Sequence, residues 1–84
     1  MELVYSPTAF RQLARLEKEI QQRILRKLDF FLSQEQPLKF ADRLTNAKIG
    51  QWRYRIGEYR VIFDVHADAL FVLAIGHRKD IYRG

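Results

Sequence analysis

Cysteine is absent from the 84 residues of this chain, and only two histidines, two prolines and four glycines occur. Without cysteine the protein has neither a disulfide framework nor a thiolate metal site. His66 and His77 stand apart, with no acidic residues spaced around them as further ligands, so we expect no bound metal ion. Since the sequence also lacks a glycine-rich phosphate-binding loop and a serine or cysteine nucleophile motif, we expect no cofactor.

Long hydrophobic runs are lacking as well. The longest one, Ala69–Ile75, is far too short to span a bilayer. The first five residues alternate like a strand and do not form the basic and then apolar regions of a secretory signal. We therefore expect a cytoplasmic protein without a membrane partner, folded as one small domain over residues 1–84.

Acidic residues are fewer than basic ones. The chain has 10 Asp and Glu against 15 Lys and Arg, which gives a formal net charge of +5. The apolar content of 48% is that of a globular protein rather than a disordered one. The positive excess favours a polyanionic or acidic partner, either a nucleic acid or an acidic protein, and charge alone does not choose between them.

The strongest pattern lies between residues 51 and 65, where apolar and polar side chains alternate as in a half-buried strand. Gly57 and Glu58 interrupt the alternation, with glycine first, as a two-residue type II′ hairpin turn prefers. Such a turn pairs Arg55 with Arg60 and Arg53 with Ile62. The resulting apolar face consists of Trp52, Tyr54, Ile56, Tyr59, Val61, Phe63 and Val65.

The opposite face of this hairpin carries Arg53, Arg55 and Arg60. Like charges directly opposite each other across a ladder are unfavourable. The pairing is tolerable if solvent screens the guanidinium groups, which would make this a solvated face. It is also tolerable if an anion lies between them, because arginine presents a planar fork of donors suited to phosphate oxygens.

Before the hairpin, the pattern predicts a short strand at Leu3–Tyr5 and then helices. Ser6 can cap a helix, and Pro7 fits a first helical position. Apolar spacing predicts one helix over residues 8–16, a turn near residues 17–18 and a second helix to about Ser33. A single bent helix is the alternative, because no glycine or proline marks the break.

Residues 33–43 contain Pro37 and read as a loop, which Leu38, Phe40 and Leu44 are expected to pin to the core. After a turn at residues 66–69, residues 70–75 are apolar on both faces, as in a covered central strand. The whole pattern predicts an α+β fold in which two N-terminal helices pack on one face of a four-stranded, mainly antiparallel sheet. We expect four side chains to be buried beneath the helices: Trp52, Tyr59, Val61 and Phe63.

Basic and aromatic residues gather on or beside the arginine face. The segment after the last strand can fold to this rim. The candidate catalytic residues are Arg53, Arg55, Arg60, His77, Arg78 and Tyr82, and the candidate RNA-binding residues are Arg53, Arg55, Arg60, Lys79 and Arg83. Cleaving RNA without a metal requires a group that takes the 2′-OH proton, cations that stabilise the phosphorane and a proton for the 5′-oxygen. The same composition also suits a passive RNA-binding surface.

Two stretches, Tyr54–Phe63 and Val72–Tyr82, resemble the RelE/ParE toxin superfamily, and Ser6–Phe10 followed by a helical pair matches its opening. The resemblance covers essentially the whole chain and implies the RelE-like microbial RNase fold. Its RelE branch implies a ribosome-dependent mRNA endonuclease that an acidic, RelB-like antitoxin holds inactive. Its ParE branch implies a protein that poisons DNA gyrase and generally lacks the basic catalytic set. This sequence keeps that set and is therefore more similar to RelE; a ParE-like inhibitor and an inactive RNA-binding module remain the alternatives.

The resemblance also implies roles for single residues. Arg60 matches the arginine that binds the scissile phosphate, Arg78 the arginine that aids the leaving group, and Tyr82 the tyrosine that stacks on a base. Arg53 and Arg55 stand where the family's best-known members have lysines. Because a guanidinium stays charged, Arg53 is a poor general base. We assign the acid/base role to His77, whose unperturbed pKa lies near neutrality; the alternative is a histidine that packs at the strand end.

Overall fold

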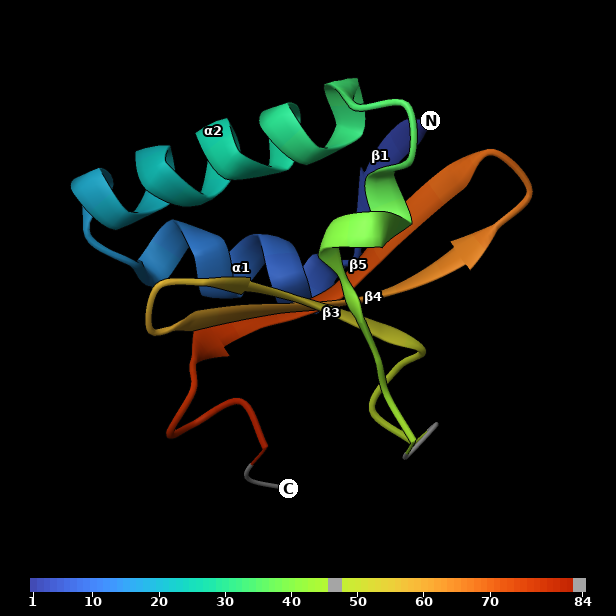
Figure 1. Cartoon of the computed structure of the whole chain (residues 1–84). Coiled ribbons are helices and arrows are strands. Elements are labelled where there is room, and N and C mark those ends of the chain that lie inside the picture. Colours follow the sequence, from blue (N-terminus) through green and yellow to red (C-terminus); the bar gives the residue numbers. More distant parts are fainter. Residues whose placement is uncertain (46–47, 83–84) are drawn as a thin grey trace.

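The computed structural model describes residues 1–45 and 48–82 of the chain (Figure 1). The elements are, in chain order, β1 (Glu2–Tyr5), α1 (Pro7–Arg15), α2 (Lys18–Ser33), a 3₁₀ helix η1 (Pro37–Phe40), β2 (Asp42–Arg43), β3 (Trp52–Ile56), β4 (Tyr59–His66) and β5 (Ala69–His77). Both long helices lie on one side of the sheet. The expected α+β arrangement is therefore confirmed. No helix in the described part of the chain is long and apolar enough to cross a bilayer.

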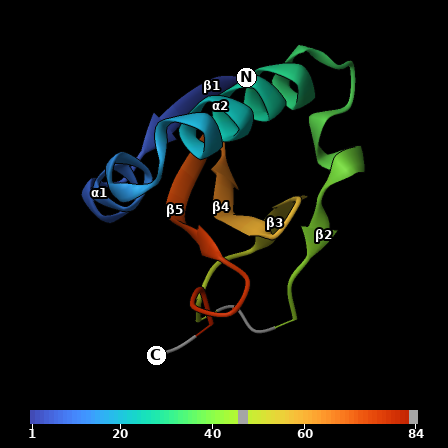
Figure 2. The ribbon, with the colours of Figure 1, turned by 90° about the vertical axis from the view of Figure 1, so that its left-hand side faces the viewer.

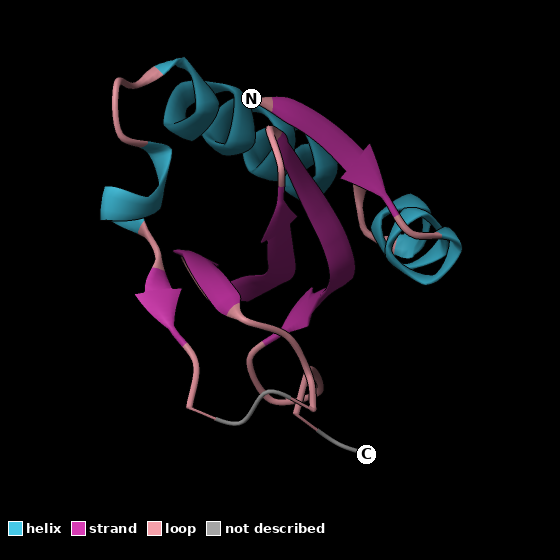
Figure 3. Cartoon of the chain, turned by 90° about the vertical axis from the view of Figure 1, so that its right-hand side faces the viewer, coloured by secondary structure: helices cyan, strands magenta, loops and turns pink. Residues whose placement is uncertain are grey.

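The sheet has five strands in the order β1-β5-β4-β3-β2, one more than expected. Strand β1 runs parallel to β5, whereas the other neighbours are antiparallel. The additional strand is β2, which has only two residues and lies in the segment that the sequence predicts to be a loop. Figure 3 shows it as a short arrow at the edge of the sheet, beside β3.

The two helices are separate, as the apolar spacing predicts, and the bent-helix alternative is wrong. Ser6 caps α1: its Oγ accepts a hydrogen bond from Ala9 N at 3.0 Å. The chain becomes extended at Leu16, where ψ is 156°. The Gln21 side chain then donates to the backbone oxygens of Ala14 and Leu16, at 3.1 and 2.9 Å. A glutamine amide thus satisfies carbonyls that the end of α1 leaves unpaired, so the break needs neither glycine nor proline.

The hairpin of β3 and β4 has the predicted register, with Arg55 opposite Arg60 and Arg53 opposite Ile62. Gly57 has a φ of 59°, as the first position of a type II′ turn requires. A Cβ atom there would also lie only 2.6 Å from the guanidinium of Arg23, a residue of α2. Figure 2 shows α2 above β4 and β5. The turn therefore depends on glycine for its conformation and for the close approach of the helix.

The core lies between the helices and the sheet. It contains Ala9, Ile24, Leu28 and Phe31 from the helices and Tyr54, Ile56, Val61, Phe63, Leu70, Val72 and Ile75 from the strands. Leu38 packs against this core and Phe40 stacks on Phe31 at 5.4 Å, as expected of the loop before β2. Leu44 is half-buried, and its N–H donates to Gln51 O at 2.9 Å.

Two expectations about burial need correction. Val61 and Phe63 are buried, but Trp52 and Tyr59 are only partly buried and pack against the core from its margin, because they lie at the two ends of the β3–β4 ladder. Trp52 also packs under the guanidinium group of Arg43 in β2, whose Cζ lies 5.0 Å from the ring centroid.

The arginine face is also not open along its whole length. Ile62 on that face is only 1% exposed. The backbone at Gly50 crosses over it so closely that a Cβ atom would lie 2.6 Å from Ile62 Cγ2. The segment before β3 thus covers the centre of this face and leaves the hairpin end accessible.

The Tyr54 side chain supports a prediction about stability. Its ring is stacked between Phe31 and Phe63, at 4.3 and 4.7 Å, and its hydroxyl donates to Pro37 O at 2.8 Å. Tyr54→Phe should therefore lower the free energy of unfolding by about 1 kcal/mol at neutral pH, because the hydrogen bond is lost. Burial also raises the pKa of the Tyr54 phenol from 10.0 to about 12.

As the pH rises, the Tyr54 phenol loses its proton in the unfolded chain before it does so in the folded protein. The contribution of the protonated phenol to stability is therefore fully present below pH 10 and is lost as the pH rises toward 12. The free energy of unfolding, measured by urea denaturation between pH 10 and 12, should fall more steeply with pH for the wild type than for Tyr54→Phe. Equal declines in the two proteins would show that another group is responsible.

Candidate functional site

An open cleft of about 480 Å³ lies at the hairpin end of the arginine face, on the side of the sheet away from the helices. Six side chains line it: Arg53, Arg55, Arg60, Arg78, Lys79 and Tyr82. The structure therefore brings together the candidate residues of β3, β4 and the C-terminal segment. His77, the last residue of β5, does not line this cleft. Arg83 belongs to the predicted RNA-binding set but lies outside the described residues.

Local geometry explains how these side chains meet. Arg53 and Arg55 are two residues apart on β3 and so share a face, and Arg60 on β4 lies directly opposite Arg55. Beyond β5 the chain turns back, with Asp80 N and Ile81 N donating to His77 O at 2.9 and 3.0 Å. This turn carries Tyr82 under the sheet, where its hydroxyl accepts from Arg53 Nη1 at 2.7 Å.

Asp42 is part of this arrangement, although the sequence does not indicate it. It lies on β2 opposite Arg53. Its Oδ2 accepts from Arg53 Nε and Nη2, at 3.2 and 3.0 Å, and pairs with Arg55 Nε at 3.0 Å. One carboxylate thus holds two neighbouring guanidinium groups and offsets part of the repulsion between Arg55 and Arg60.

The hydrogen bond to Tyr82 raises the pKa of the Arg53 guanidinium above its ordinary value. Partial burial opposes this effect, and the bond to Asp42 adds to it. Arg53 is therefore charged at every pH of interest and cannot serve as a base. The prediction that it is a poor proton acceptor agrees with this direction of the pKa shift.

The two remaining arginines are held by acceptors on the hairpin turn. Arg60 Nη1 donates to the backbone oxygens of Gly57 and Tyr59, both at 2.9 Å. Arg78 is bound twice to Glu58, through its backbone N–H to Glu58 O at 2.7 Å and through Nε to Oε2 at 2.6 Å. Both partners of this ion pair are more than half exposed. In the described part of the chain, Asp42 and Glu58 are the carboxylates that pair with arginines of the cleft, so positive charge remains in excess among its four arginines and Lys79.

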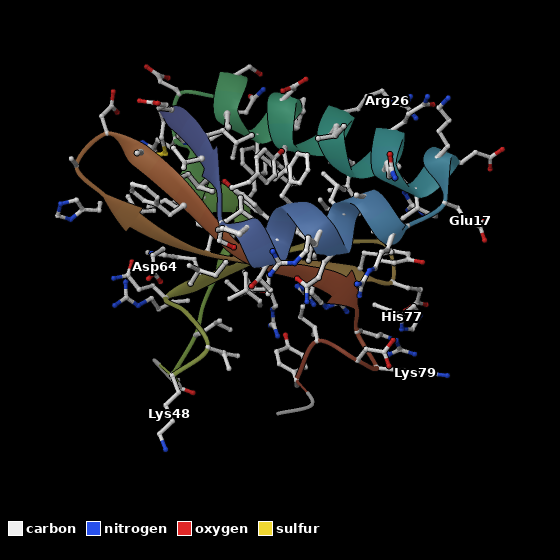
Figure 4. All side chains as sticks on the ribbon, turned by 180° about the vertical axis from the view of Figure 1, so that it is seen from behind. Glu17, Arg26, Lys48, Asp64, His77 and Lys79 are labelled. Carbon is white, nitrogen blue, oxygen red and sulfur yellow. The ribbon has the colours of Figure 1, made fainter. Side chains whose placement is uncertain are left out.

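His77 does not lie with the arginines, and the prediction that it does is wrong. Its register partner is Tyr59, and the two rings are in edge contact at 5.5 Å. It lines a separate groove with residues of α1, on the helix side of the sheet. Its Nδ1 accepts from Lys79 N at 3.1 Å. This position supports the alternative of a strand-end histidine that packs on the sheet; Figure 4 shows it near Lys79 where the chain leaves β5.

A β-bulge explains the placement of His77. Phe63 pairs with Val72, but Ile62 pairs with Ala74, so Leu73 is an extra residue in β5. Unbroken alternation from the buried Val72 would point His77 toward the arginine face. The extra residue reverses the alternation and leaves Gly76, not His77, opposite Arg60.

The arrangement can bind and stabilise a polyanion. Several guanidinium groups converge on one small surface, as the recognition of a phosphate requires. Among the cleft residues only Lys79 and Tyr82 have side chains that can release a proton, since arginine stays protonated. Within residues 1–45 and 48–82, no three histidine or acidic side chains come together as metal ligands.

Comparisons with known proteins agree with the fold. The family model described as the ParE toxin of type II toxin-antitoxin systems matches residues 3–82. The toxin-antitoxin complex RelBE2 from Mycobacterium tuberculosis contains a chain of 25% identity and TM-score 0.78, with 92% of this chain and 96% of that chain covered. The RelB-RelE complex from Methanococcus jannaschii contains one of 22% identity and TM-score 0.72, with 94% of each chain covered. No curated protein matches significantly.

Proposed function

The chain belongs to the ParE toxin family of type II toxin-antitoxin systems, and we propose that it acts as a RelE-like toxin that cuts mRNA on the ribosome. Its resemblance to the RelE/ParE superfamily is thus confirmed. Family membership is compatible with either branch. The single observation that favours RNA cleavage is the cleft, which gathers four arginines, Lys79 and Tyr82 on one surface. The resemblance implies that the gyrase-poisoning branch generally lacks such a set.

In the proposed reaction, the ribose 2′-oxygen attacks the adjacent phosphorus atom and displaces the 5′-oxygen of the next nucleotide. The 2′-OH loses its proton and the leaving 5′-oxygen gains one. Arg60 and Arg78 would stabilise the negative charge that builds up on the phosphorane. Tyr82, which is 45% exposed, is available to stack on a base and to align the nucleotide.

Proton transfer in this scheme needs groups inside the cleft. His77 lines a different groove, so it drops out of the proposal. Tyr82 and Lys79 are the proton-carrying side chains that remain. Arg53 and Arg55 contribute charge and orientation, because their guanidinium groups do not exchange protons at neutral pH.

We also propose an acidic antitoxin as partner. Both similar structures are toxin-antitoxin complexes. The net charge of +5 and the positive cleft would attract an acidic segment that covers the arginines. A second, smaller groove on α2 is also basic, since Arg23, Arg26 and Lys27 line it around the exposed Phe30. An acidic partner could therefore contact two basic surfaces of the toxin.

Primer extension on cellular mRNA after induced expression tests the proposed reaction. We expect new 5′ ends inside translated reading frames, and none in the same transcript when its start codon is removed. Co-expression of an acidic protein encoded beside the toxin should suppress the cuts. Arrest of growth with intact mRNA and damaged DNA would instead identify a gyrase poison. Binding of RNA without cuts would identify an inactive RNA-binding module.

A further inference from the structure

We infer that Asp42 is a positioning residue of the cleft: it orients Arg53 and Arg55 and, through Arg53, the hydroxyl of Tyr82. The inference rests on the proposed RNA cleavage for its functional consequence, while its structural part stands on the contacts alone. It assigns a role to an acidic residue in a cleft that otherwise attracts anions.

The contacts form a continuous chain across three segments of the protein. A single oxygen of Asp42, Oδ2, receives two donors of Arg53 and one of Arg55. Arg53 then uses Nη1, its remaining terminal nitrogen, for Tyr82 at 2.7 Å. Strand β2, strand β3 and the C-terminal turn are thereby joined side chain to side chain. Movement of Asp42 would release all three cleft residues together.

Burial distinguishes Asp42 from Glu58, the other carboxylate at the cleft. The side chains of Asp42 and Arg53 are 35% and 26% exposed, whereas those of Glu58 and Arg78 are 60% and 53% exposed. Solvent screens the outer pair strongly, so it constrains Arg78 weakly. The pair of Asp42 with Arg53 is better shielded, and two nitrogens of Arg53, Nε and Nη2, donate to the same Asp42 oxygen, which restricts the orientation of this guanidinium group.

A carboxylate in this position has a cost, because it repels the phosphates of RNA. Its presence is understandable if the fixed geometry of the arginines and Tyr82 accelerates the chemical step by more than the repulsion weakens binding. This reasoning predicts opposite effects on binding and on cleavage. A residue that merely supports the fold would not produce such a separation.

Asp42→Asn tests the inference because it keeps the shape of the side chain and removes its charge. We expect single-turnover cleavage on programmed ribosomes to slow by about tenfold to a hundredfold at saturating toxin. We expect affinity for a single-stranded RNA oligonucleotide with a 2′-deoxy target to rise, and the slope of log K against log salt to steepen by about 0.7. The pH–rate profile should keep its shape.

Asp68→Asn is the matched control. It removes the same charge from the turn between β4 and β5, where the side chain is 94% exposed and away from the cleft-lining residues. Cleavage rate and salt slope should stay at their wild-type values. Equal behaviour of the two variants in both measurements would overturn the inference. Loss of the acidic limb of the pH–rate profile in Asp42→Asn would also overturn it, because Asp42 would then itself take the proton.

A measurement without RNA separates this inference from the proposed function. The Nε–H resonances of Arg53 and Arg55 in a ¹⁵N-labelled sample should both shift in Asp42→Asn, and the Arg53 side-chain resonances should shift in Tyr82→Phe. If the wild type cuts no RNA yet these shifts occur, the proposed function fails and the structural role of Asp42 stands. If the wild type cuts RNA but Asp42→Asn shows no shift of the Arg53 and Arg55 resonances, Asp42 does not position the arginines.

Discussion

Arg60→Ala and Arg78→Ala are each expected to lower the rate of mRNA cleavage by about 10²–10³-fold and to abolish toxicity. Both guanidinium groups line the cleft. In the proposed reaction each one donates hydrogen bonds to a phosphate that becomes more negative as the 2′-oxygen attacks. Loss of a preorganised donor to such a developing charge typically has an effect of this size.

The fold should survive both substitutions, because neither side chain belongs to the core. Among residues 1–45 and 48–82, the Arg60 side chain bonds to carbonyls at its own hairpin turn, those of Gly57 and Tyr59. The ion pair of Arg78 with Glu58 is more than half exposed on both sides, and such pairs contribute about 0–1 kcal/mol to stability. Circular dichroism and thermal melting should therefore show folded variants that differ little from the wild type.

Single-turnover cleavage on programmed ribosomes measures the effect on rate. Arg11→Ala is the matched control, since it removes the same charge from an exposed site on α1, on the other side of the sheet. This control should cut mRNA at the wild-type rate. A rate close to that of wild type in both Arg60→Ala and Arg78→Ala would show that the cleft is not where the phosphate reacts.

The hairpin was predictable because its information is local. A two-residue turn with glycine first fixes which residues face each other, and the alternation on either side of Gly57 agrees with that register. Arg53, Arg55 and Arg60 were therefore placed correctly from sequence alone. The two helices were predictable for a similar reason, since apolar spacing fails at Glu17 and resumes at Ile20.

The contribution of Asp42 was not predictable, because it depends on a strand of two residues. A strand as short as β2 has no alternation to detect, and it forms only because it pairs with β3. Asp42 meets Arg53 through that pairing, across a connection that runs from β2 to β3. Nothing in the polar segment around Asp42 indicates which strand will lie beside it.

The position of His77 was missed for a different reason. A β-bulge leaves no reliable mark in an apolar strand such as β5, where both faces carry hydrophobic residues. The extra residue, Leu73, has the same chemical character as its neighbours. Faces of a strand beyond such a bulge can be assigned only when its partner strand is known.

Replacing the ribose 2′-OH at the cleavage site by hydrogen should stop cleavage completely and leave binding almost unchanged. The 2′-oxygen is the nucleophile in the proposed reaction, so its removal eliminates the attacking atom. Binding depends mainly on contacts between phosphates and the cations of the cleft, which a deoxy substitution does not touch. The effect on rate should therefore exceed that of any single arginine substitution.

The chemical nature of the products provides the second part of this test. Attack by the 2′-oxygen forms a 2′,3′-cyclic phosphate, which can open to a 3′-phosphate, and leaves a hydroxyl on the 5′ end of the other fragment. A 5′ end produced in this way can be phosphorylated directly by a polynucleotide kinase and labelled. Fragments with a 5′-phosphate would mean that water attacked and the 3′-oxygen left, a reaction in which the 2′-OH has no necessary part. Cleavage of the deoxy substrate at the normal rate would lead to the same conclusion, and the mechanism built on Arg60 and Arg78 around a 2′-oxygen nucleophile would be wrong.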